Sequence, residues 1–578
     1  MRRMNERTGR VLLAFLLSSV MPLSAADNQT PQPTEIEQLK QMLADQQKQI
    51  NELRQALVQQ QGVQQHANAP VTAAAPVLPA VDPTPVSTFR NLGEVASTTG
   101  LVPRPKSLPV AKALPAIPLP QAVAPNATGS AKNPCEADVD KVVPTFIRIG
   151  NVCVVPIGFM DLTPYWRDKN AGSSMGSNFG SIPFNNAVNG NLKEFRFSSQ
   201  NARIGFRVDG DWKGAHFIGY NEFDFNGTSG STNLAVSNGA IVPRLRLYWA
   251  DVRKSKIEFL AGQSWSMLTP NRNGLSALPG DLFFTQVIDI NYVAGLTWTR
   301  QPGMRVLIHP NKKVTFGFSV EQPDQYIGGS AGGSGITLPS GLTALGGSQL
   351  DNSQNISLGG FLAQPSVTPD FIAKIAFDPT SRFHFEVGGI ESNFKTVTTA
   401  APWTHHSTEG AGLLVGFNVA ILKNLRLMSS NFFSDGEGRY LFGQAPDIIV
   451  RTDGSLSPVR ADSTLDGIEL TIKNTLLYAY YGGIYIGRNT AIDSNGSRIG
   501  YGYTGAPNSQ NRAINEFTFG FNQTMWRNPR YGAINVMGQY EYLMREPWFV
   551  AAGTPKATHD NTIYFNIRYT LPGAMPNF

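Results

Sequence analysis

Arginine residues recur at short, even intervals in several stretches of the chain. The stretch "RLRLYWA" begins with Arg244 and Arg246, and "SSQNARIGFRV" contains Arg203 and Arg207. A guanidinium group stays charged at any working pH and binds a carboxylate through two parallel hydrogen bonds. On a β-strand, residues an even number of positions apart share one face, so each stretch would present its arginines together. The pattern indicates a surface that attracts small anions. The alternative is that acidic residues on the same face neutralise it.

The elements that carry these arginines are predicted to be strands. From residue 146 onward, many segments alternate apolar with polar residues. In "TIYFNIRYTL", Ile563, Phe565 and Ile567 fall on one face. Asn566 and Arg568 fall on the opposite face. Strict alternation is typical of a strand whose two faces meet different environments.

The connections between the strands switch regularly between tight turns and long Gly-rich loops. Seven tight turns lie near residues 209, 254, 309, 378, 422, 473 and 527, and eight long loops centre near 180, 235, 278, 345, 400, 448, 500 and 551. Fifteen connections imply sixteen strands, and short turns on one rim with long loops on the other are typical of outer-membrane barrels. The fold class predicted for residues 146–578 is therefore all-β, a 16-stranded antiparallel transmembrane β-barrel.

A barrel of this size has a lipid-facing outside and a lumen too wide for side chains to fill. The alternation directs one set of arginines into that lumen, and the third long loop adds Arg272. The predicted channel-lining residues are Arg196, Arg203, Arg207, Arg244, Arg246, Arg272, Arg305 and Arg568. Other residues predicted to face inward are Arg382, Arg426, Glu258, Glu386, Glu469, Glu516 and Glu541. Trp166, Trp249, Trp298 and Trp526 are expected in an interfacial girdle.

The third long loop, "SMLTPNRNGLSALPGDLFFTQVIDIN", contains more apolar residues than an exposed loop needs. Its candidates for burial are Leu275, Leu278, Leu282, Phe283 and Phe284. A loop folded into the lumen would bury them, narrow the channel and bring Arg272 to the constriction. The alternatives are an extracellular lid and a subunit contact.

The first 26 residues are predicted to be a secretory signal peptide. Arg2, Arg3, Arg7 and Arg10 precede the apolar run "VLLAFLLSSVMPL" and a small-residue segment that ends at Ala26. Cleavage there removes four Arg and one Glu, so the formal charge falls from +6 to +3. A nearly balanced charge favours no nucleic-acid partner. No later apolar run is long enough for a transmembrane helix.

Residues 34–61 are predicted to form a periplasmic α-helical coiled coil. Apolar residues at a and d positions recur over four heptads, and Thr34 with Glu37 forms a capping box. The predicted trimerisation residues are Ile36, Leu39, Leu43, Ile50, Leu53 and Leu57. Two glutamines at d positions leave the strand number of the coil open.

Residues 67–134 form a Pro/Ala-rich linker between the coiled coil and the barrel. Cys135 and Cys153 flank the end of the linker, and they are the two cysteines of the chain. Export to an oxidising compartment favours a disulfide between them. Two free thiols, or a pair within a metal site, is the alternative, although no CxxC spacing and no neighbouring His supports a metal.

Motifs for catalysis and metal binding lack the context that they need. "GSSMG" has no strand-to-helix elbow, and "GYGYTG" opens no helix. His405 and His406 in "THHSTE" would point to opposite sides of a strand. We therefore expect no catalytic residue, no metal and no cofactor.

Several motifs resemble those of one known family. "GQSWSML", "TRQPGMRV" and "SSQNARIGFRV" are similar to segments of the DcaP-like outer-membrane porins. The resemblance covers roughly residues 35–65 and 150–578, and the long linker and the cysteine pair depart from the family pattern. It implies a trimer of 16-stranded channels with an N-terminal periplasmic coiled coil. It also implies uptake of small carboxylate solutes.

The expected function is that of a bacterial outer-membrane porin. Such a protein is a passive diffusion channel for small hydrophilic solutes, here with a preference for small anions such as dicarboxylates. The expected partners are outer-membrane lipid, two further copies of the chain and the permeating solutes. The alternative is a structural protein that tethers the membrane to the cell wall through the coiled coil and the linker. An enzyme is not expected.

Overall fold

The computed structural model describes residues 146–227, 242–283, 286–329, 333, 335–340, 361–363, 368–398, 402–528 and 531–572. The predicted signal peptide, coiled coil, linker and Cys135 lie outside these residues. So do all six predicted trimerisation residues and Phe284.

The described residues form one closed antiparallel sheet of 19 strands. Three of these, β1 (Ile147–Ile149), β3 (Glu194–Ser198) and β10 (Phe361–Ala363), are short segments that flank or extend longer strands. The other sixteen form the wall. They are β2 (Val152–Arg167), β4 (Arg203–Trp212), β5 (Ala215–Gly227), β6 (Val242–Lys254), β7 (Ile257–Trp265), β8 (Arg300–Asn311), β9 (Val314–Glu321), β11 (Asp370–Thr380), β12 (Phe383–Thr398), β13 (His405–Leu422), β14 (Leu425–Asp435), β17 (Arg460–Ile472), β18 (Thr475–Ile486), β21 (Asn511–Asn528), β22 (Gly532–Pro547) and β23 (Thr558–Thr570).

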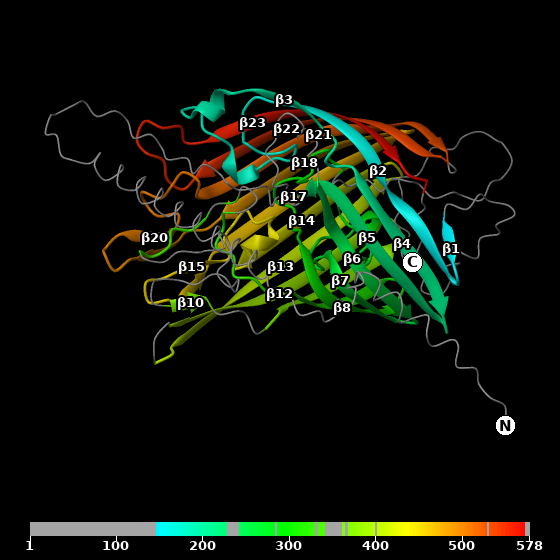
Figure 1. Cartoon of the computed structure of the whole chain (residues 1–578), viewed down its shortest axis with the longest axis horizontal. Coiled ribbons are helices and arrows are strands. Elements are labelled where there is room, and N and C mark those ends of the chain that lie inside the picture. Colours follow the sequence, from blue (N-terminus) through cyan, green and yellow to red (C-terminus); the bar gives the residue numbers. More distant parts are fainter. Residues whose placement is uncertain are drawn as a thin grey trace, which may run out of the picture. The chain divides into compact units, whose positions relative to one another are not determined.

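The last wall strand closes the barrel by pairing with the first. In this register Met160 of β2 lies opposite Tyr569 of β23, and Trp166 lies opposite Ile563. Figure 1 shows β23, in red, beside β2, in cyan. Tight turns and long loops alternate around the wall as predicted, so the sixteen-stranded barrel is confirmed. None of the described helices is long and apolar enough to cross a membrane.

The loops contain the remaining short elements. Two hairpins pair β15 (Ile448–Val450) with β16 (Leu456–Pro458) and β19 (Asn489–Ile492) with β20 (Arg498–Tyr501). The described 3-10 helices are η2 (Phe179–Ser181), η3 (Val188–Asn191), η5 (Pro279–Asp281) and η6 (Gly438–Tyr440).

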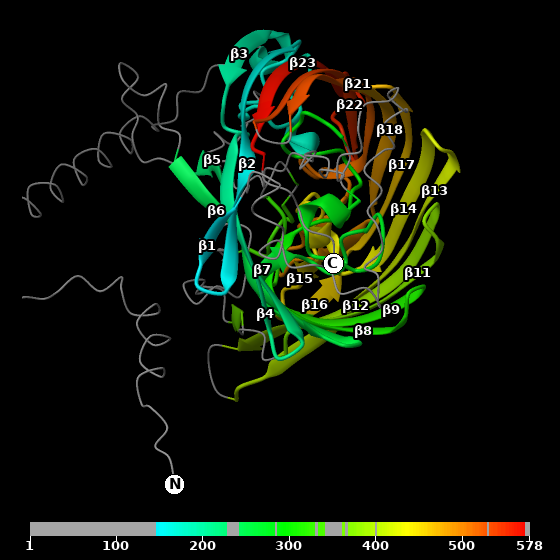
Figure 2. The same ribbon diagram turned by 90° about the vertical axis from the view of Figure 1, so that its right-hand side faces the viewer.

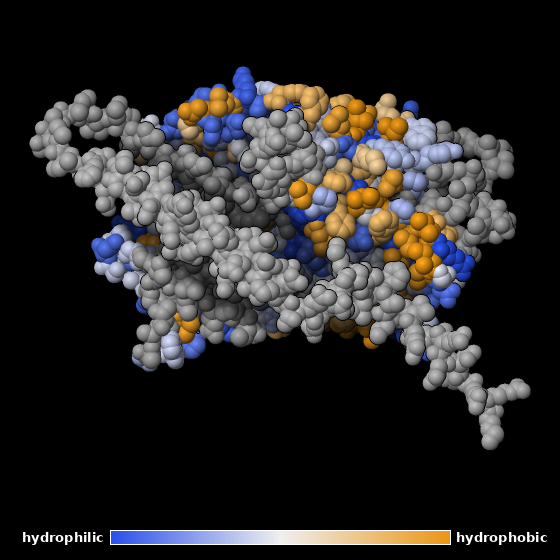
Figure 3. Space-filling view, viewed as in Figure 1, coloured by the Kyte–Doolittle hydropathy of each residue, from blue (hydrophilic) through white to orange (hydrophobic). Residues whose placement is uncertain are grey.

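The two faces of the wall differ sharply in chemistry. On β4, Ile204 and Phe206 point outward and are 47% and 42% exposed, whereas Arg203 and Arg207 point inward and are 6% and 0% exposed. Figure 3 shows apolar side chains on the outer wall around β2 and β4. Apolar groups outside and charged groups inside are the arrangement of a barrel that sits in lipid.

Candidate functional site: the loops inside the barrel

The long loop between β7 and β8 folds into the barrel. We call its described parts, residues 266–283 and 286–299, the lumen loop. Leu275, Leu278, Leu282 and Phe283 are buried in a hydrophobic core that also contains wall residues such as Leu307. Figure 2 shows loop segments inside the ring of strands. The prediction that this loop narrows the lumen is therefore supported by its position.

Wall carboxylates hold the first half of the lumen loop by accepting its backbone N–H groups. Glu321 of β9 accepts the N–H of Met267 at 2.8 Å. Glu386 of β12 accepts the N–H of Asn271, with both oxygens 3.1 Å away. A buried charged acceptor makes a stronger hydrogen bond than a neutral one. These contacts fix the loop to two separate parts of the wall.

The second half of the lumen loop is held on the opposite side of the barrel. Gln286 donates its N–H to the Tyr480 hydroxyl of β18 at 3.1 Å. Ala294 donates its N–H to Glu516 of β21 at 2.8 Å. The anchors of the loop thus run from β9 to β21, and the loop crosses the lumen between them.

An ion pair fixes the centre of the lumen loop. The Arg272 guanidinium donates to both oxygens of Glu469 on β17, at 2.7 and 3.0 Å. Burial acts to lower the pKa of Arg272, but the charge of Glu469 outweighs it and raises that pKa. Arg272 therefore lies inside the barrel as predicted, with its charge directed at a wall carboxylate.

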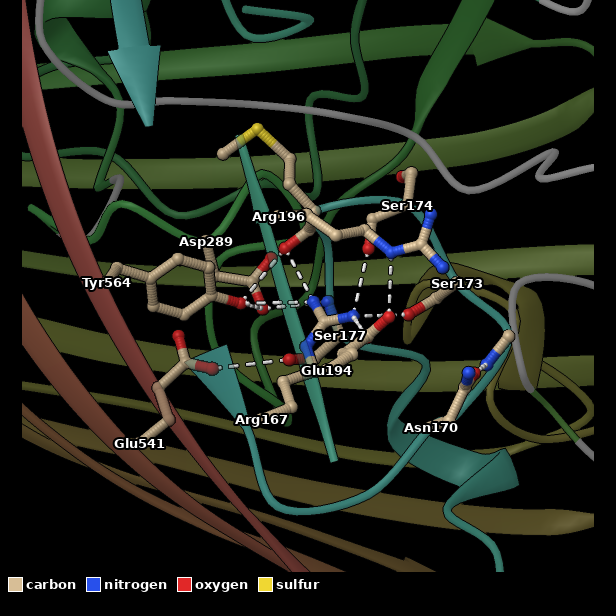
Figure 4. Close-up of polar contacts among 12 residues, drawn as sticks. Arg167, Asn170, Ser173, Ser174, Ser177, Glu194, Arg196, Asp289, Glu541 and Tyr564 are labelled. Carbon is tan, nitrogen blue, oxygen red and sulfur yellow. Dashed lines mark hydrogen bonds and ion pairs between the residues drawn. The ribbon is translucent and has the colours of Figure 1, made fainter. Parts of the chain in front are cut away.

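The loop between β2 and β3 also turns inward and packs on the lumen loop. Arg167, at the end of β2, donates to the Ser173 hydroxyl at 2.8 Å and to the Met175 carbonyl at 2.7 Å. It also forms an ion pair with Glu194 at 3.2 Å. Figure 4 shows Arg167 at the centre of these contacts, close to Tyr564.

A buried acidic residue joins these two loops. Asp289 of the lumen loop accepts the N–H of Ser177 at 2.9 Å, and the Ser177 hydroxyl donates to Glu541 of β22 at 3.2 Å (Figure 4). Burial raises the pKa of Asp289 despite its hydrogen bonds with Asn291 and Ser177. The side of the lumen next to β21 and β22 therefore carries acidic groups.

A third inward loop, residues 436–459, completes the packing. Phe442 stacks on Trp298 of the lumen loop with ring centroids 4.6 Å apart. Asp447 accepts the backbone N–H of Arg439 at 2.8 Å. Burial raises the pKa of Asp447 to about 8, although the nearby Arg439 opposes the shift.

The arginines of β4 and β6 face inward, and each one contacts a carboxylate. Arg207 binds Asp209 at 2.8 Å. Arg203 lies 3.4 Å from Glu222. Arg244 binds Asp224 at 2.8 Å. Arg246 binds Glu222 at 2.6 Å and Asp224 at 2.9 Å. These contacts favour the alternative in which acidic neighbours neutralise the arginines.

The other predicted lining residues have mixed surroundings. Arg568 pairs with Asp161 at 2.9 Å, and its guanidinium lies over the Phe159 ring. Arg305 donates to neutral groups, the Ser264 hydroxyl and the Trp265 carbonyl. Arg196 lies near the rim, where its side chain is 58% exposed and binds Glu194.

Some sequence predictions were wrong, and their causes are local. A β-bulge in β6 inserts Arg246 between two paired residues, so Trp249, which was expected in the interfacial girdle, turns inward. Trp298 is buried in the lumen loop rather than in an interfacial girdle. Arg382 is exposed in the tight turn after β11.

The inward glutamates were predicted correctly, but their role as loop anchors was not. The alternation placed Glu386, Glu469 and Glu516 inside, and it gave no sign of which backbone N–H each would accept. The inward folding of the loops at 168–193 and 436–459 was not predicted. Their buried apolar residues, such as Phe179 and Phe442, are the signal that could have shown it.

The two cysteines are divided between the described residues and the rest of the chain. Cys153 is buried on β2, and its predicted partner Cys135 lies outside the described residues, so their disulfide stays a prediction. The described residues contain no group of three or more His, Cys, Asp or Glu side chains placed to hold a metal ion.

Several solved structures are similar to this chain. The crystal structure of the outer membrane channel DcaP of Acinetobacter baumannii matches with a TM-score of 0.54 at 15% identity, covering 74% of this chain and 99% of that one. An outer-membrane-expressed OmpT of Vibrio cholerae matches with a TM-score of 0.38 at 10% identity, covering 74% and 99%. An anion-selective porin from Comamonas acidovorans matches with 0.40 at 9% identity, covering 72% and 99%. The last two scores are too low to support an argument.

No protein-family model matches the chain, and no curated protein matches it. At 15% identity the likeness to the DcaP channel is one of fold. It agrees with the resemblance that the short motifs indicated, and with the sixteen wall strands found here. The chain therefore has the closed β-barrel fold of that outer-membrane channel.

Proposed function

We propose that the protein is an outer-membrane porin through which small hydrophilic solutes diffuse passively. The observation that carries this proposal is the closed barrel, which is apolar outside and charged inside, with a loop fixed across its lumen. A barrel that sits in lipid needs an apolar outer face. Selection of solutes by size needs a loop that narrows the lumen. The fold shared with the DcaP channel supports the same function.

The proposed orientation follows from the connections. The start of β2 and the end of β23 lie on the rim of the tight turns, which is the periplasmic rim in bacterial barrels. A coiled coil N-terminal to β2 would then lie in the periplasm. We propose that it joins three copies of the chain into a homotrimer.

The proposed preference for small anions is mild. Arg203, Arg207, Arg244 and Arg246 each contact a carboxylate, so they add little net attraction for anions. The barrel also carries acidic groups near β21 and β22, such as Glu516 and Glu541. Any preference must come from cations that no carboxylate neutralises. Dicarboxylate uptake, which the family resemblance implies, remains part of this proposal.

Conductance in a planar lipid bilayer tests the proposed function. The purified full-length protein should insert in discrete steps, each with a constant ohmic conductance. Swelling of liposomes in small sugars should be fast and should slow as the sugar becomes larger. Protein that folds as a barrel but gives neither steps nor swelling would contradict the porin proposal and favour the structural tether.

A further inference from the structure

A small cavity lies beneath the lumen loop, near the ends of β11, β12, β13 and β14 that face the tight turns. Its volume is about 20 Å³. The residues that line it are Arg272, Asn273, Asp378, Thr380, Ser381, Phe383, His384, Asn418 and Arg426. A cavity that holds one water needs roughly 10–15 Å³ of this kind of volume, so the space suits a single water or a small ion.

Arg426 of β14 brings a cation to this cavity, opposite Glu469 of β17, whose carboxylate is already bound by Arg272. Its side chain is buried, with 8% exposure. Within the described part of the chain its polar partner is the Asn418 amide oxygen, and no carboxylate oxygen lies within ion-pair distance. A guanidinium has five N–H donors and does not lose its charge in a protein. Burying such a charge without an anion is costly.

Asn418 is held so that its amide oxygen faces Arg426. Its amide nitrogen donates to the backbone carbonyl of Arg272 at 3.0 Å. The oxygen is thereby left to accept from Arg426, and the amide cannot turn without losing both contacts. The lumen loop thus fixes the position of the Arg426 guanidinium through one side chain.

The acidic groups nearest the cavity already have cationic partners. Glu469 is bound by both terminal nitrogens of Arg272. Glu386 is bound by Lys374 at 3.0 Å. His384 lies between two carboxylates, 2.7 Å from Asp378 and 3.2 Å from Glu386. Ionised carboxylates only accept hydrogen bonds, so both ring nitrogens carry hydrogens and the ring is a cation.

From these contacts we propose that the cavity is a binding site for one small monovalent anion. The anion is a halide ion or the single carboxylate group of a permeating solute. Arg426 would supply the principal charge, Arg272 would lie at the edge of the site, and the Thr380 and Ser381 hydroxyls are available as neutral donors. Binding of a halide ion does not depend on the proposed porin function, whereas binding of the carboxylate group of a permeating solute does.

The site would act on transport from the side of the tight turns. An anion that has passed the lumen loop would meet Arg426 before it leaves the barrel. The cavity has room for one anion, so anions would occupy it one at a time. Selectivity for anions would then depend on Arg426 more than on the paired arginines of β4 and β6.

Bromide tests the site directly, because its anomalous X-ray signal locates it in a crystal. Crystals of the full-length protein would be soaked in sodium bromide alone and in sodium bromide with excess sodium acetate. We expect an anomalous peak in the cavity next to the Arg426 guanidinium. Acetate should remove the peak if a carboxylate group also enters, and should leave it if the site takes halides alone.

Two variants complete the test. Arg426→Gln removes the charge and should abolish the peak, whereas Arg382→Gln removes an exposed arginine that belongs to the same turn as Thr380 and Ser381 but does not line the cavity, and should keep the peak. The absence of a peak in the wild-type crystal would overturn the proposal, and so would a peak that persists in Arg426→Gln. If Arg426→Gln fails to fold, the wild-type crystal alone decides. None of these outcomes depends on conductance, so a failed site and a failed porin function remain distinguishable.

Discussion

At the scale of single residues, the interior of this barrel is governed by the cost of burying charge. Most inward arginines meet a carboxylate within hydrogen-bond distance, as Arg207 meets Asp209. Breaking such a pair by removing one partner costs about 3–5 kcal/mol, because the other charge stays buried. Arg426, which has no direct ion pair within the described residues, should therefore be sensitive to anions, and Asp447, whose pKa is raised by burial, should be sensitive to pH.

The packing of residues 436–459 inside the barrel should depend on pH because of Asp447. Its pKa is about 8 in the folded protein and lies near its ordinary value of 3.8 when the loop opens. Between these two values the packed loop keeps the Asp447 proton and the opened loop loses it, so the stability of the packed loop falls as the pH rises from 3.8 to about 8 and levels off above that. Hydrogen exchange of the Val459 N–H, which donates to the Asp447 carbonyl, should be slower at pH 6 than at pH 9 after correction for the intrinsic rate.

Asp447→Asn is the control for this effect. The neutral amide has no charge to desolvate, so the difference in protection between pH 6 and pH 9 should shrink. Part of it should remain, since burial also raises the pKa of Glu437 in the same loop. A variant with an unchanged difference would show that Asp447 does not control the loop.

At the scale of elements, carboxylates of the wall strands hold the lumen loop across the barrel. Glu469→Gln removes the anionic partner of Arg272. It should destabilise the folded position of the lumen loop by about 3–5 kcal/mol. The loop should then open more often, which increases both the conductance of single channels and its noise. Limited proteolysis should cut within residues 266–299 sooner than in the wild type.

The matched control is Glu409→Gln, which removes an exposed glutamate from β13. It should leave conductance and proteolysis unchanged, although it alters the formal charge by the same amount. Equal behaviour of the two variants would mean that the ion pair between Arg272 and Glu469 does not hold the loop.

The sequence predicted the wall well, because alternation and the lengths of the connections both depend on local chemistry. A turn such as the one between β6 and β7 is short in sequence and short in space. The interior was harder to predict, because its contacts join residues far apart in the chain, such as Arg272 and Glu469. The bulge at Arg246 was also missed, since one inserted residue inverts every face assignment that follows it.

At the scale of the whole molecule, the proposed homotrimer rests on the sequence of the coiled coil. The protein should resist SDS at room temperature and run as a compact trimer until it is boiled. Polar substitutions at Leu39, Ile50 and Leu53 should weaken the trimer without unfolding the barrel, because apolar a and d residues supply the contacts between helices. An unboiled wild-type sample that runs as a monomer would count against the trimer.

The balance of charge inside the barrel should set its ion selectivity. Arg244→Gln with Arg246→Gln removes two cations and takes from Asp224 and Glu222 the arginines that neutralise them. The reversal potential in a gradient of potassium chloride should therefore move toward cation selectivity. The shift should be largest at low salt and fade as the concentration rises, since the Debye length is about 10 Å at 0.1 M.

Arg382→Gln, in an exposed turn, provides the comparison for this double variant. It should move the reversal potential far less, because water and salt screen a charge outside the barrel.

Wild-type protein should show a mild anion preference in the same gradient at low salt. A wild type that favours cations would mean that the acidic groups near β21 and β22 outweigh Arg426, and the proposed anion preference would then be wrong. If the double variant leaves the potential unchanged, ions do not pass close to β5 and β6, and the path must lie along another part of the wall.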